Sequence, residues 1–195
     1  MPFIIETIVT TRDTHGRINF APMGVEWGAS VIVLKPYQDT TTFRNLVATR
    51  EAVVNVTDNV MLFAQAAIAD PTFPHRPARV VQGAVLEDVC SWREVRVLKV
   101  DTRAPRARIP CQIVYRGVAR EFIGYNRAQA AVIEAAILAT RIRFLPMEQI
   151  LRDIERLQVI VRKTGGAREH TAMQLLVAYI QRAAAVHGVS RQGTS

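Results

Sequence analysis

Hydroxyl-bearing and basic side chains gather in one short stretch of the sequence, residues 35–50. Three consecutive threonines precede a segment of helical character: Thr40, Thr41 and Thr42. Three cations lie close to them in the sequence: Lys35, Arg44 and Arg50. Hydroxyls, the first backbone amides of a helix and a cation are the groups that bind a phosphate in proteins. The stretch therefore predicts a phosphate site, although threonines before a helix also serve as simple N-caps.

A second stretch, residues 19–25, has the composition of a slot for a flat heterocycle. Pro22 frees one edge of a predicted strand, Met23 brings a soft apolar side chain, and Gly24 permits close approach. Asn45 and Asn55 add amides for polar edges. A phosphorylated heterocycle such as flavin mononucleotide (FMN) needs both stretches. Taken alone, the Ala-Pro-Met-Gly run is also typical of a bulge at a strand end.

Other kinds of chemistry lack their usual residues. Cys90 and Cys111 are too few and too far apart for a disulfide scaffold or a CxxC pair, and they are interpreted as reduced core residues. The four histidines are scattered, with no HExxH motif, so no metal site is expected. The sequence contains no GxSxG, Walker or GxGxxG motif. Hydrolase, nucleoside triphosphatase and Rossmann interpretations are therefore disfavoured.

Composition sets the class of protein. The chain has 195 residues, of which 49% are hydrophobic and 22% charged, enough for a folded core. No apolar run approaches the roughly 18–20 residues that span a bilayer, and the first residues lack the features of a secretory signal. A cytoplasmic protein without membrane contact is expected.

The net charge of +8 raises the question of nucleic acid. The densest basic cluster is TRAPRARIP, with Arg103, Arg106 and Arg108, and aromatic residues make up only 7% of the chain. We interpret this segment as a solvated arginine-rich loop, because no aromatic RNA-binding motif accompanies it. Nucleic acid is thus not the expected partner, and a nucleic-acid-binding β-barrel is the alternative.

Short strands dominate residues 3–124. Alternating, β-branched segments predict eight strands, at residues 4–11, 18–27, 29–35, 51–58, 78–87, 92–101, 109–116 and 117–125. Gly16 predicts the first hairpin turn, and prolines break the chain at residues 71–77. Two short helices are expected, at residues 40–49 with a threonine cap and at 58–68 with Asp58 as the N-cap. Many short strands predict a closed or sandwiched antiparallel sheet.

The hydrophobic period changes to 3.6 residues after Asn126. An alanine-rich helix is expected at 126–144, and a second one begins at Pro146, with an apolar stripe of Ile150, Ile154, Leu157 and Val161. Gly165 and Gly166 predict a left-handed helix stop, with an anion-binding turn as the alternative. A third helix carries Met173, Leu176, Val177 and Ile180, followed by a frayed tail, residues 187–195.

These motifs together resemble a known superfamily. An N-x-A-P-M segment, an Asp-Thr followed by Asn-Leu, and Glu-x-Val-Val-Asn-Val are similar to the FMN-binding split-barrel proteins, which include flavin reductases and pyridoxamine-phosphate-oxidase-like proteins. More closely, the chain resembles an uncharacterised flavin-reductase-like split-barrel family of methanogens and methylotrophs. This likeness rests on ETIVTT, APMGV, FRNL, AVVNVTD, YNRAQAAVIEAAILATR and KTGG, and spans nearly the whole chain.

The resemblance implies a fold and a site. The fold is mainly β plus α: an antiparallel split β-barrel over residues 1–124 and a C-terminal helical subdomain over 125–195. It also implies a homodimer with FMN near the interface. The isoalloxazine would be lined by Asn19, Ala21, Pro22, Met23, Gly24 and Val25. The ribityl phosphate would lie near Asp39, Thr40, Thr41, Thr42 and Asn45.

Two points of the resemblance leave a choice open. The superfamily's reductases carry a basic residue directly before the Asp-Thr, but this chain has Gln38 there, so the phosphate cation must come from elsewhere and Lys35 is the candidate. Asn126 and Arg127 form a family-like motif at the start of the long helix. This motif either approaches the flavin or a substrate, or anchors the helix to the barrel.

The expected function is that of a flavin-dependent oxidoreductase, in which the flavin carries the redox chemistry and the protein positions it. Family members in methylotrophs are associated with tetrahydromethanopterin-linked one-carbon metabolism, so a pterin is the candidate substrate. The alternatives are a non-catalytic flavin binder or cofactor-biosynthesis partner, and the nucleic-acid-binding β-barrel.

Overall fold

The computed structural model describes residues 1–192, which form two compact units. The barrel unit comprises residues 1–58 and 70–122, and the helical unit comprises residues 59–69 together with the chain from residue 123 onward. The chain therefore passes between the units three times. Residues 59–69 lie inside the range predicted as barrel, yet they pack with the C-terminal helices, so a single cut at residue 124 does not describe the division.

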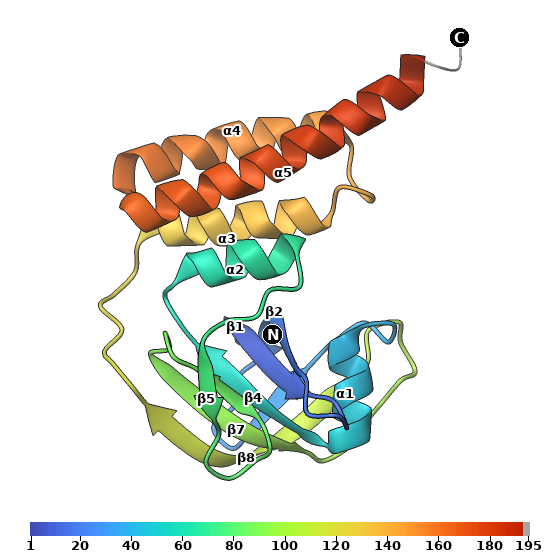
Figure 1. Ribbon diagram of the computed structural model, residues 1–195, viewed down its shortest axis with the longest axis vertical. Helices are drawn as coiled ribbons and strands as arrows, with labels where there is room; N and C mark the ends of the chain where they lie inside the picture. Colours follow the sequence, from blue (N-terminus) through green and yellow to red (C-terminus); the bar gives the residue numbers. More distant parts are fainter. Residues whose placement is uncertain (193–195) are drawn as a thin grey trace. The chain divides into compact units, whose positions relative to one another are not determined.

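Six antiparallel strands close the barrel, as the resemblance predicted (Figure 1). Their order around the barrel is β1-β2-β3-β8-β7-β4. Their bounds are β1 Ile4–Arg12, β2 Ile18–Glu26, β3 Val31–Leu34, β4 Glu51–Val56, β7 Ser91–Val97 and β8 Ile109–Val118. Gly16, with a φ of 90°, turns β1 into β2 as expected.

The strand prediction was wrong at three places, one of which is the predicted strand 78–87, where only β6 (Ala84–Leu86) is extended and residues 78–83 form a loop. No separate strand forms at residues 117–125, because β8 continues to Val118 and the chain then leaves the sheet. In the proline-rich segment, β5 (His75–Pro77) pairs with β6 (Ala84–Leu86) in a small second sheet. A two-stranded sheet consists of edges alone, and an edge strand tolerates prolines.

Alternate residues of the six strands fill the barrel core. Val9, Val25, Val54 and Cys111 all belong to one buried cluster, together with Leu46 from helix α1 (Thr41–Thr49). Burial raises the pKa of the Cys111 thiol to about 12, which fits the interpretation of this residue as a small core hydrophobe.

The helical unit consists of α2 (Val60–Ile68), α3 (Arg127–Thr140), α4 (Met147–Thr164) and α5 (Ala167–Gln192). Ile150, Ile154 and Val161 lie in its core, as the predicted stripe required, and α3 contributes mainly buried alanines. The first C-terminal helix is shorter than predicted and ends at Thr140. The third helix continues through Gln192, whereas a frayed tail was predicted from residue 187. The last three residues of that predicted tail lie outside the described part of the chain. Among residues 1–192, no helix combines the length and the hydropathy of a membrane-spanning segment.

The predicted cap of α2 was one residue off. Asn59, not Asp58, is the N-cap, and its side chain accepts a hydrogen bond from the Met61 amide at 3.1 Å. Asp58 belongs to the barrel unit and forms an ion pair with Arg120. The hydrogen bonds from Arg120 are the first cause that lowers the pKa of Asp58, and they outweigh the opposing effect of burial. An Asp-Asn pair before a helix offers two possible caps, and the arginine 62 residues away decides between them.

Candidate functional site

The predicted phosphate site lies at the first turn of α1. Thr40 is the N-cap: its hydroxyl accepts from the Phe43 amide at 3.2 Å and donates to the Tyr37 carbonyl at 2.7 Å. The amides of Thr41 and Thr42 come next, and the first amides of a helix have no acceptor within it. The first turn of α1 contains no acidic residue. The first turn therefore presents amides and a hydroxyl and contains no carboxylate, and the nearest acid in the sequence is Asp39, directly before the cap.

Arg44 brings a positive charge to the same turn. Its Nη1 donates to the Asp39 carbonyl at 2.8 Å, and its Nη2 donates to the Thr41 hydroxyl at 3.0 Å. Arg44 and Thr41 are both exposed, and within residues 1–192 the Arg44 guanidinium has no ion-pair partner. The guanidinium is therefore held beside the helix start with its charge uncompensated, which is the electrostatic requirement of an anion site.

Two hydrogen bonds, one part-buried and one buried, join α1 to the β1–β2 hairpin. The Asn19 amide donates to the Thr42 hydroxyl at 3.0 Å, and the Asn45 amide donates to the Thr11 hydroxyl at 3.1 Å. The two predicted stretches, 35–50 and 19–25, therefore meet in space. Thr42 and Asn45 are buried, so they fix the position of α1 and leave Thr41 and Arg44 as the accessible groups.

Strand β2 has one edge without a strand partner over most of its length. Its whole length pairs with β1, but within the described residues it pairs with β3 only at Glu26 and Val33. Residues 18–25 therefore carry backbone groups on the β3 side that no strand uses. Pro22 lies in the middle of this edge, where its missing N–H interrupts no ladder. The edge runs away from Asn19, the residue that contacts α1.

The predicted ring-lining residues divide between the two faces of β2. Val25 and Met23 pack into the barrel core, whereas Pro22 and Gly24 occupy the alternate positions and are partly exposed. A Cβ on Gly24 would come within 2.7 Å of the Glu6 carboxylate and 2.9 Å of Ile4. Any side chain at position 24 would therefore clash with the neighbouring strand β1, which is a structural reason for glycine there that the sequence did not show.

Lys35 and Asn55 have partners within the fold. The Lys35 amine donates to Glu26 at 2.8 Å, and Arg108 donates to the same carboxylate at 3.0 Å. The bond from Lys35 is the largest cause that lowers the pKa of Glu26. Asn55 is 0% exposed; its amide donates to the Ile8 carbonyl and accepts from the Leu86 amide, both at 3.0 Å. Lys35 thus neutralises a carboxylate, and Asn55 joins β4 to β1 and β6.

Asn126 and Arg127 belong to the helical unit. The Asn126 side chain caps α3 by accepting from the Ala128 amide at 2.7 Å, and it donates to the Thr164 carbonyl at 3.0 Å. Arg127 is exposed at the first position of α3. Asn126 therefore joins the start of α3 to the end of α4, which is a structural role within this unit.

The three arginines of the arginine-rich loop each have a partner nearby in the fold. Arg103 forms an ion pair with Asp101, and Arg108 forms one with Glu26. Arg106 donates to the Lys35 carbonyl at 3.0 Å and stacks on the Tyr37 ring. Hydrogen bonds from Arg103 lower the pKa of Asp101. These contacts agree with the interpretation of the segment as a solvated loop.

Comparison with known proteins places this architecture in a class. The FMN-bound protein from Methanosarcina mazei has a TM-score of 0.80 to this chain at 22% identity, and the match covers 92% of this chain and 96% of that one. Nitrilotriacetate monooxygenase component B from Bacillus cereus gives a TM-score of 0.52 at 16% identity, over 67% and 77% of the two chains. Flavoredoxin from Desulfovibrio vulgaris gives 0.50 at 13%, over 60% and 70%. The fold is that of the flavin-reductase-like split barrels.

The family is defined by sequence. Residues 5–120 match the N-terminal domain, and residues 126–178 the following part, of the family described as protein of unknown function (DUF447). The chain belongs to this family. The Methanosarcina mazei protein is assigned to the same family.

Proposed function

We propose that this protein is a flavoprotein that binds FMN between the start of α1 and the free edge of β2. The observation that carries the proposal is the hydrogen bond from Asn19 to Thr42, because it joins the uncompensated Arg44 turn to the unpaired strand edge. A bound FMN in the Methanosarcina mazei relative supports it. The groups present suit this cofactor: a dianionic phosphate needs a cation and N–H donors, and a flavin needs backbone donors and acceptors along its pyrimidine edge.

Different groups of the protein bind the phosphate and the ring of the cofactor. Arg44, the Thr41 hydroxyl and the first amides of α1 bind the phosphate, and Arg44 takes the role for which the sequence offered Lys35. The backbone of residues 21–24 faces the ring. When bound, FMN supplies hydride and electron transfer. Thr42, Asn19 and Asn45 keep the two sides of the site in register.

A redox function follows as the finer part of the proposal. We infer a flavin-dependent oxidoreductase, with a reduced or oxidised pterin as the candidate substrate, as the family resemblance implies. Anaerobic addition of NADH or NADPH should bleach the flavin absorption, and a pterin acceptor should restore it. Flavin that neither nicotinamide reduces, and that no acceptor reoxidises after chemical reduction, would favour the non-catalytic flavin binder.

A homodimer is the proposed assembly. The barrel unit exposes large apolar side chains, among them Phe3 at 67% and Val118 at 78%, and their burial against a second copy of the chain would be favourable. Light scattering after size-exclusion chromatography should give about twice the chain mass of 21.8 kDa. A mass equal to one chain would contradict the dimer.

The binding site is tested by two single variants. Arg44→Gln should weaken FMN binding by at least about tenfold, since a charged hydrogen bond contributes ~1.5–3 kcal/mol. Lys35→Gln should leave the affinity within about twofold, because that amine serves Glu26. Arg152→Gln, on the surface of α4, is the control. Flavin fluorescence quenching measures all three. Wild-type affinity in Arg44→Gln would remove Arg44 from the site, and a protein that binds no FMN would refute the function.

A further inference from the structure

A cavity of about 300 Å³ that is open to solvent on one side lies between α4 and α5 in the helical unit. Each helix contributes three residues at spacing i, i+3, i+4, which is the spacing of one helix face. The six lining residues are Gln158, Val161 and Arg162 from α4, and His170, Met173 and Gln174 from α5. Val161 and Met173 are buried and form an apolar floor. The other four side chains are polar and form its rim.

The four rim side chains have no polar partner in the fold. Arg162 and Gln174 are exposed and Gln158 and His170 are half-buried, and within residues 1–192 these four side chains make no hydrogen bond and no ion pair with the protein. The cavity lining contains no carboxylate. Arg162 offers only donors, and each glutamine offers two, so the rim has an excess of N–H groups and one permanent positive charge. A complementary ligand therefore carries acceptors and a negative charge.

The chemistry of the rim changes along its length, from basic side chains at one end to neutral amides at the other. α4 and α5 run antiparallel from the turn at Gly165 and Gly166 (Figure 1). Arg162 and His170 consequently stand at the turn end, and the two glutamines stand one helical turn further away. Four residues of helix rise about 6 Å. The positions of an anionic group and of an amide-binding group are thus separated by about 6 Å across an apolar floor.

The turn at Gly165 and Gly166 is held by contacts within the chain, and it does not itself offer an anion site. Gly165 is extended, with φ −84° and ψ 148°, so the predicted left-handed stop was wrong. Its lack of a side chain is steric, because a Cβ would lie 2.8 Å from the Val161 carbonyl. The Gly166 amide donates to the Glu169 carboxylate at 2.9 Å, so the chain's own acid occupies the turn. Any external anion must therefore use the rim.

We propose that the α4–α5 cavity binds a small organic acid. The carboxylate contacts Arg162 and His170, the apolar body lies on Val161 and Met173, and a neutral polar group lies between Gln158 and Gln174. The volume is at the lower end of the range for small-molecule pockets. This site is independent of the flavin site, and neither proposal requires the other.

The test uses the full-length protein and a probe of matching dimensions, 4-carbamoylbenzoate, whose two groups stand at opposite ends of one ring. Its neutral analogue terephthalamide keeps the shape and removes the charge. Calorimetry should show at least about tenfold tighter binding of the acid, and NMR should show shifts at the Met173 methyl and the His170 ring. Equal affinity for acid and diamide would overturn the proposal.

Variants and a second anion separate the remaining outcomes. Arg162→Gln should weaken 4-carbamoylbenzoate binding about tenfold or more, whereas Arg156→Gln, on the same helix but paired with Asp153, should not change it. Both residues are exposed, so both variants should keep the wild-type helical circular dichroism. Inorganic phosphate that binds as tightly as 4-carbamoylbenzoate, with the same dependence on Arg162, would overturn the assignment to an organic acid. FMN affinity should be unchanged in Arg162→Gln.

Discussion

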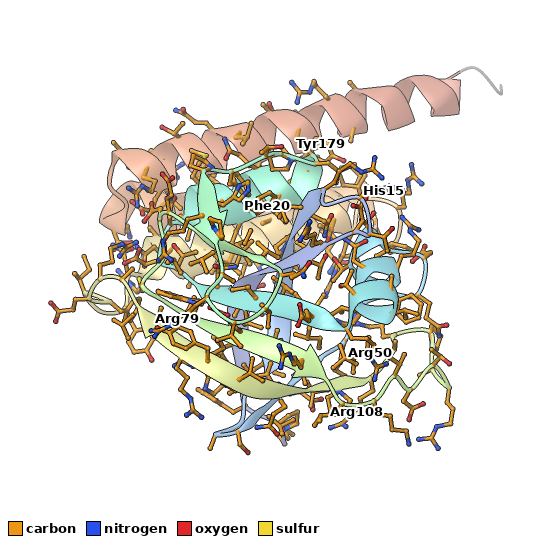
Figure 2. All side chains as sticks on the ribbon, turned by 60° about the horizontal axis from the view of Figure 1, so that its bottom comes forward. His15, Phe20, Arg50, Arg79, Arg108 and Tyr179 are labelled. Carbon is orange, nitrogen blue, oxygen red and sulfur yellow. The ribbon has the colours of Figure 1, made fainter. Side chains whose placement is uncertain are left out.

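Two places in the barrel unit present consecutive backbone amides, and at one of them a carboxylate of the chain accepts from these amides. In the loop at residues 79–81, the Glu94 carboxylate accepts from the amides of Arg79 at 2.8 Å, Val80 at 2.6 Å and Val81 at 3.0 Å. At the start of α1, the amides of Thr41 and Thr42 stand beside Arg44 with no acid in the first turn. Figure 2 labels Arg79, which belongs to the first place, and Arg50, the C-cap at the end of α1 opposite to the second place.

The difference separates a structural anion site from one for a ligand. Glu94 is 0% exposed, and its carboxylate also accepts from the Trp92 indole at 3.2 Å. Burial acts to raise the pKa of Glu94, but the bonds from the 79–81 amides outweigh it, so the pKa is below its ordinary value. Where the fold requires an anion, the chain supplies one. The cationic turn of α1 receives none, which is why we assign the FMN phosphate there.

The largest expected effect is on stability, in Glu94→Ala. Removing the carboxylate leaves buried N–H donors without an acceptor, which should lower the free energy of unfolding by about 3 kcal/mol in urea titrations followed by circular dichroism. Glu51→Ala is the matched control. Glu51 accepts from the Gln82 amide at 2.7 Å in the same loop but is partly exposed, so a loss of about 1 kcal/mol is expected. Equal losses in the two variants would contradict a special role for the buried carboxylate.

The next effect is on cofactor affinity, in Thr41→Glu. This substitution gives α1 the internal acid that the 79–81 loop already has. FMN binding should weaken by about a hundredfold, because a carboxylate competes for Arg44 and repels the phosphate. The unfolding free energy without FMN should stay equal or rise by about 0.5 kcal/mol, since an acid at a helix N-terminus is favourable.

Thr41→Gln is the control for size in that experiment. It lengthens the side chain by the same amount without charge, so it should lose far less affinity than Thr41→Glu. If both variants weaken FMN binding equally, then steric blocking and not charge explains the result, and the comparison of the two anion sites loses its support.

The fold was predictable to the extent that local pattern determines it. Alternating β-branched residues gave the barrel strands, the threonine run gave the cap of α1 at Thr40, and Gly16 gave the first turn. The failures depend on contacts between distant residues. Arg120 takes Asp58 away from the start of α2, and α2 joins the C-terminal helices because its apolar side chains need a second layer.

The candidate site was predictable as a juxtaposition but not in its details. The sequence predicted that residues 19–25 and 35–50 converge, and in the structure a hydrogen bond from Asn19 to Thr42 joins them. It could not show that Lys35 is used by Glu26, or that Asn55 is enclosed on all sides, because both depend on strands that meet only in the folded barrel. Pro22 indicated a free edge on β2, but the length of that edge could not be predicted, since it results from how few residues β3 pairs with β2.

The contribution of Glu94, the acid of the 79–81 site, to stability should depend on pH. Because the folded pKa of Glu94 is lowered, its stabilisation is complete above the unfolded pKa of about 4.3 and is lost as pH falls through the folded value. The unfolding free energy should therefore fall on acidification below about pH 4.5. Glu26 and Asp58 act in the same direction, so the informative quantity is the difference between the wild type and Glu94→Gln. That difference should shrink as the pH falls, and a constant difference from pH 7 to 3 would contradict the assignment.

The smallest effect is expected at the glycine turn of the helical unit, where Glu169 repeats the arrangement of Glu94 with a single amide. Glu169→Ala frees the Gly166 amide at the start of α5 and should lower the unfolding free energy by about 1 kcal/mol, as the loss of a capping carboxylate does. Glu148→Ala removes an exposed acid paired with Arg152 on α4 and should change it by less than about 0.5 kcal/mol. If the filled turn works like the 79–81 loop, inorganic phosphate should stabilise Glu169→Ala more than the wild type, because in the wild type it can act only at the α1 turn and not at the glycine turn. Phosphate that stabilises both proteins equally would mean that Glu169 does not hold the place of an anion.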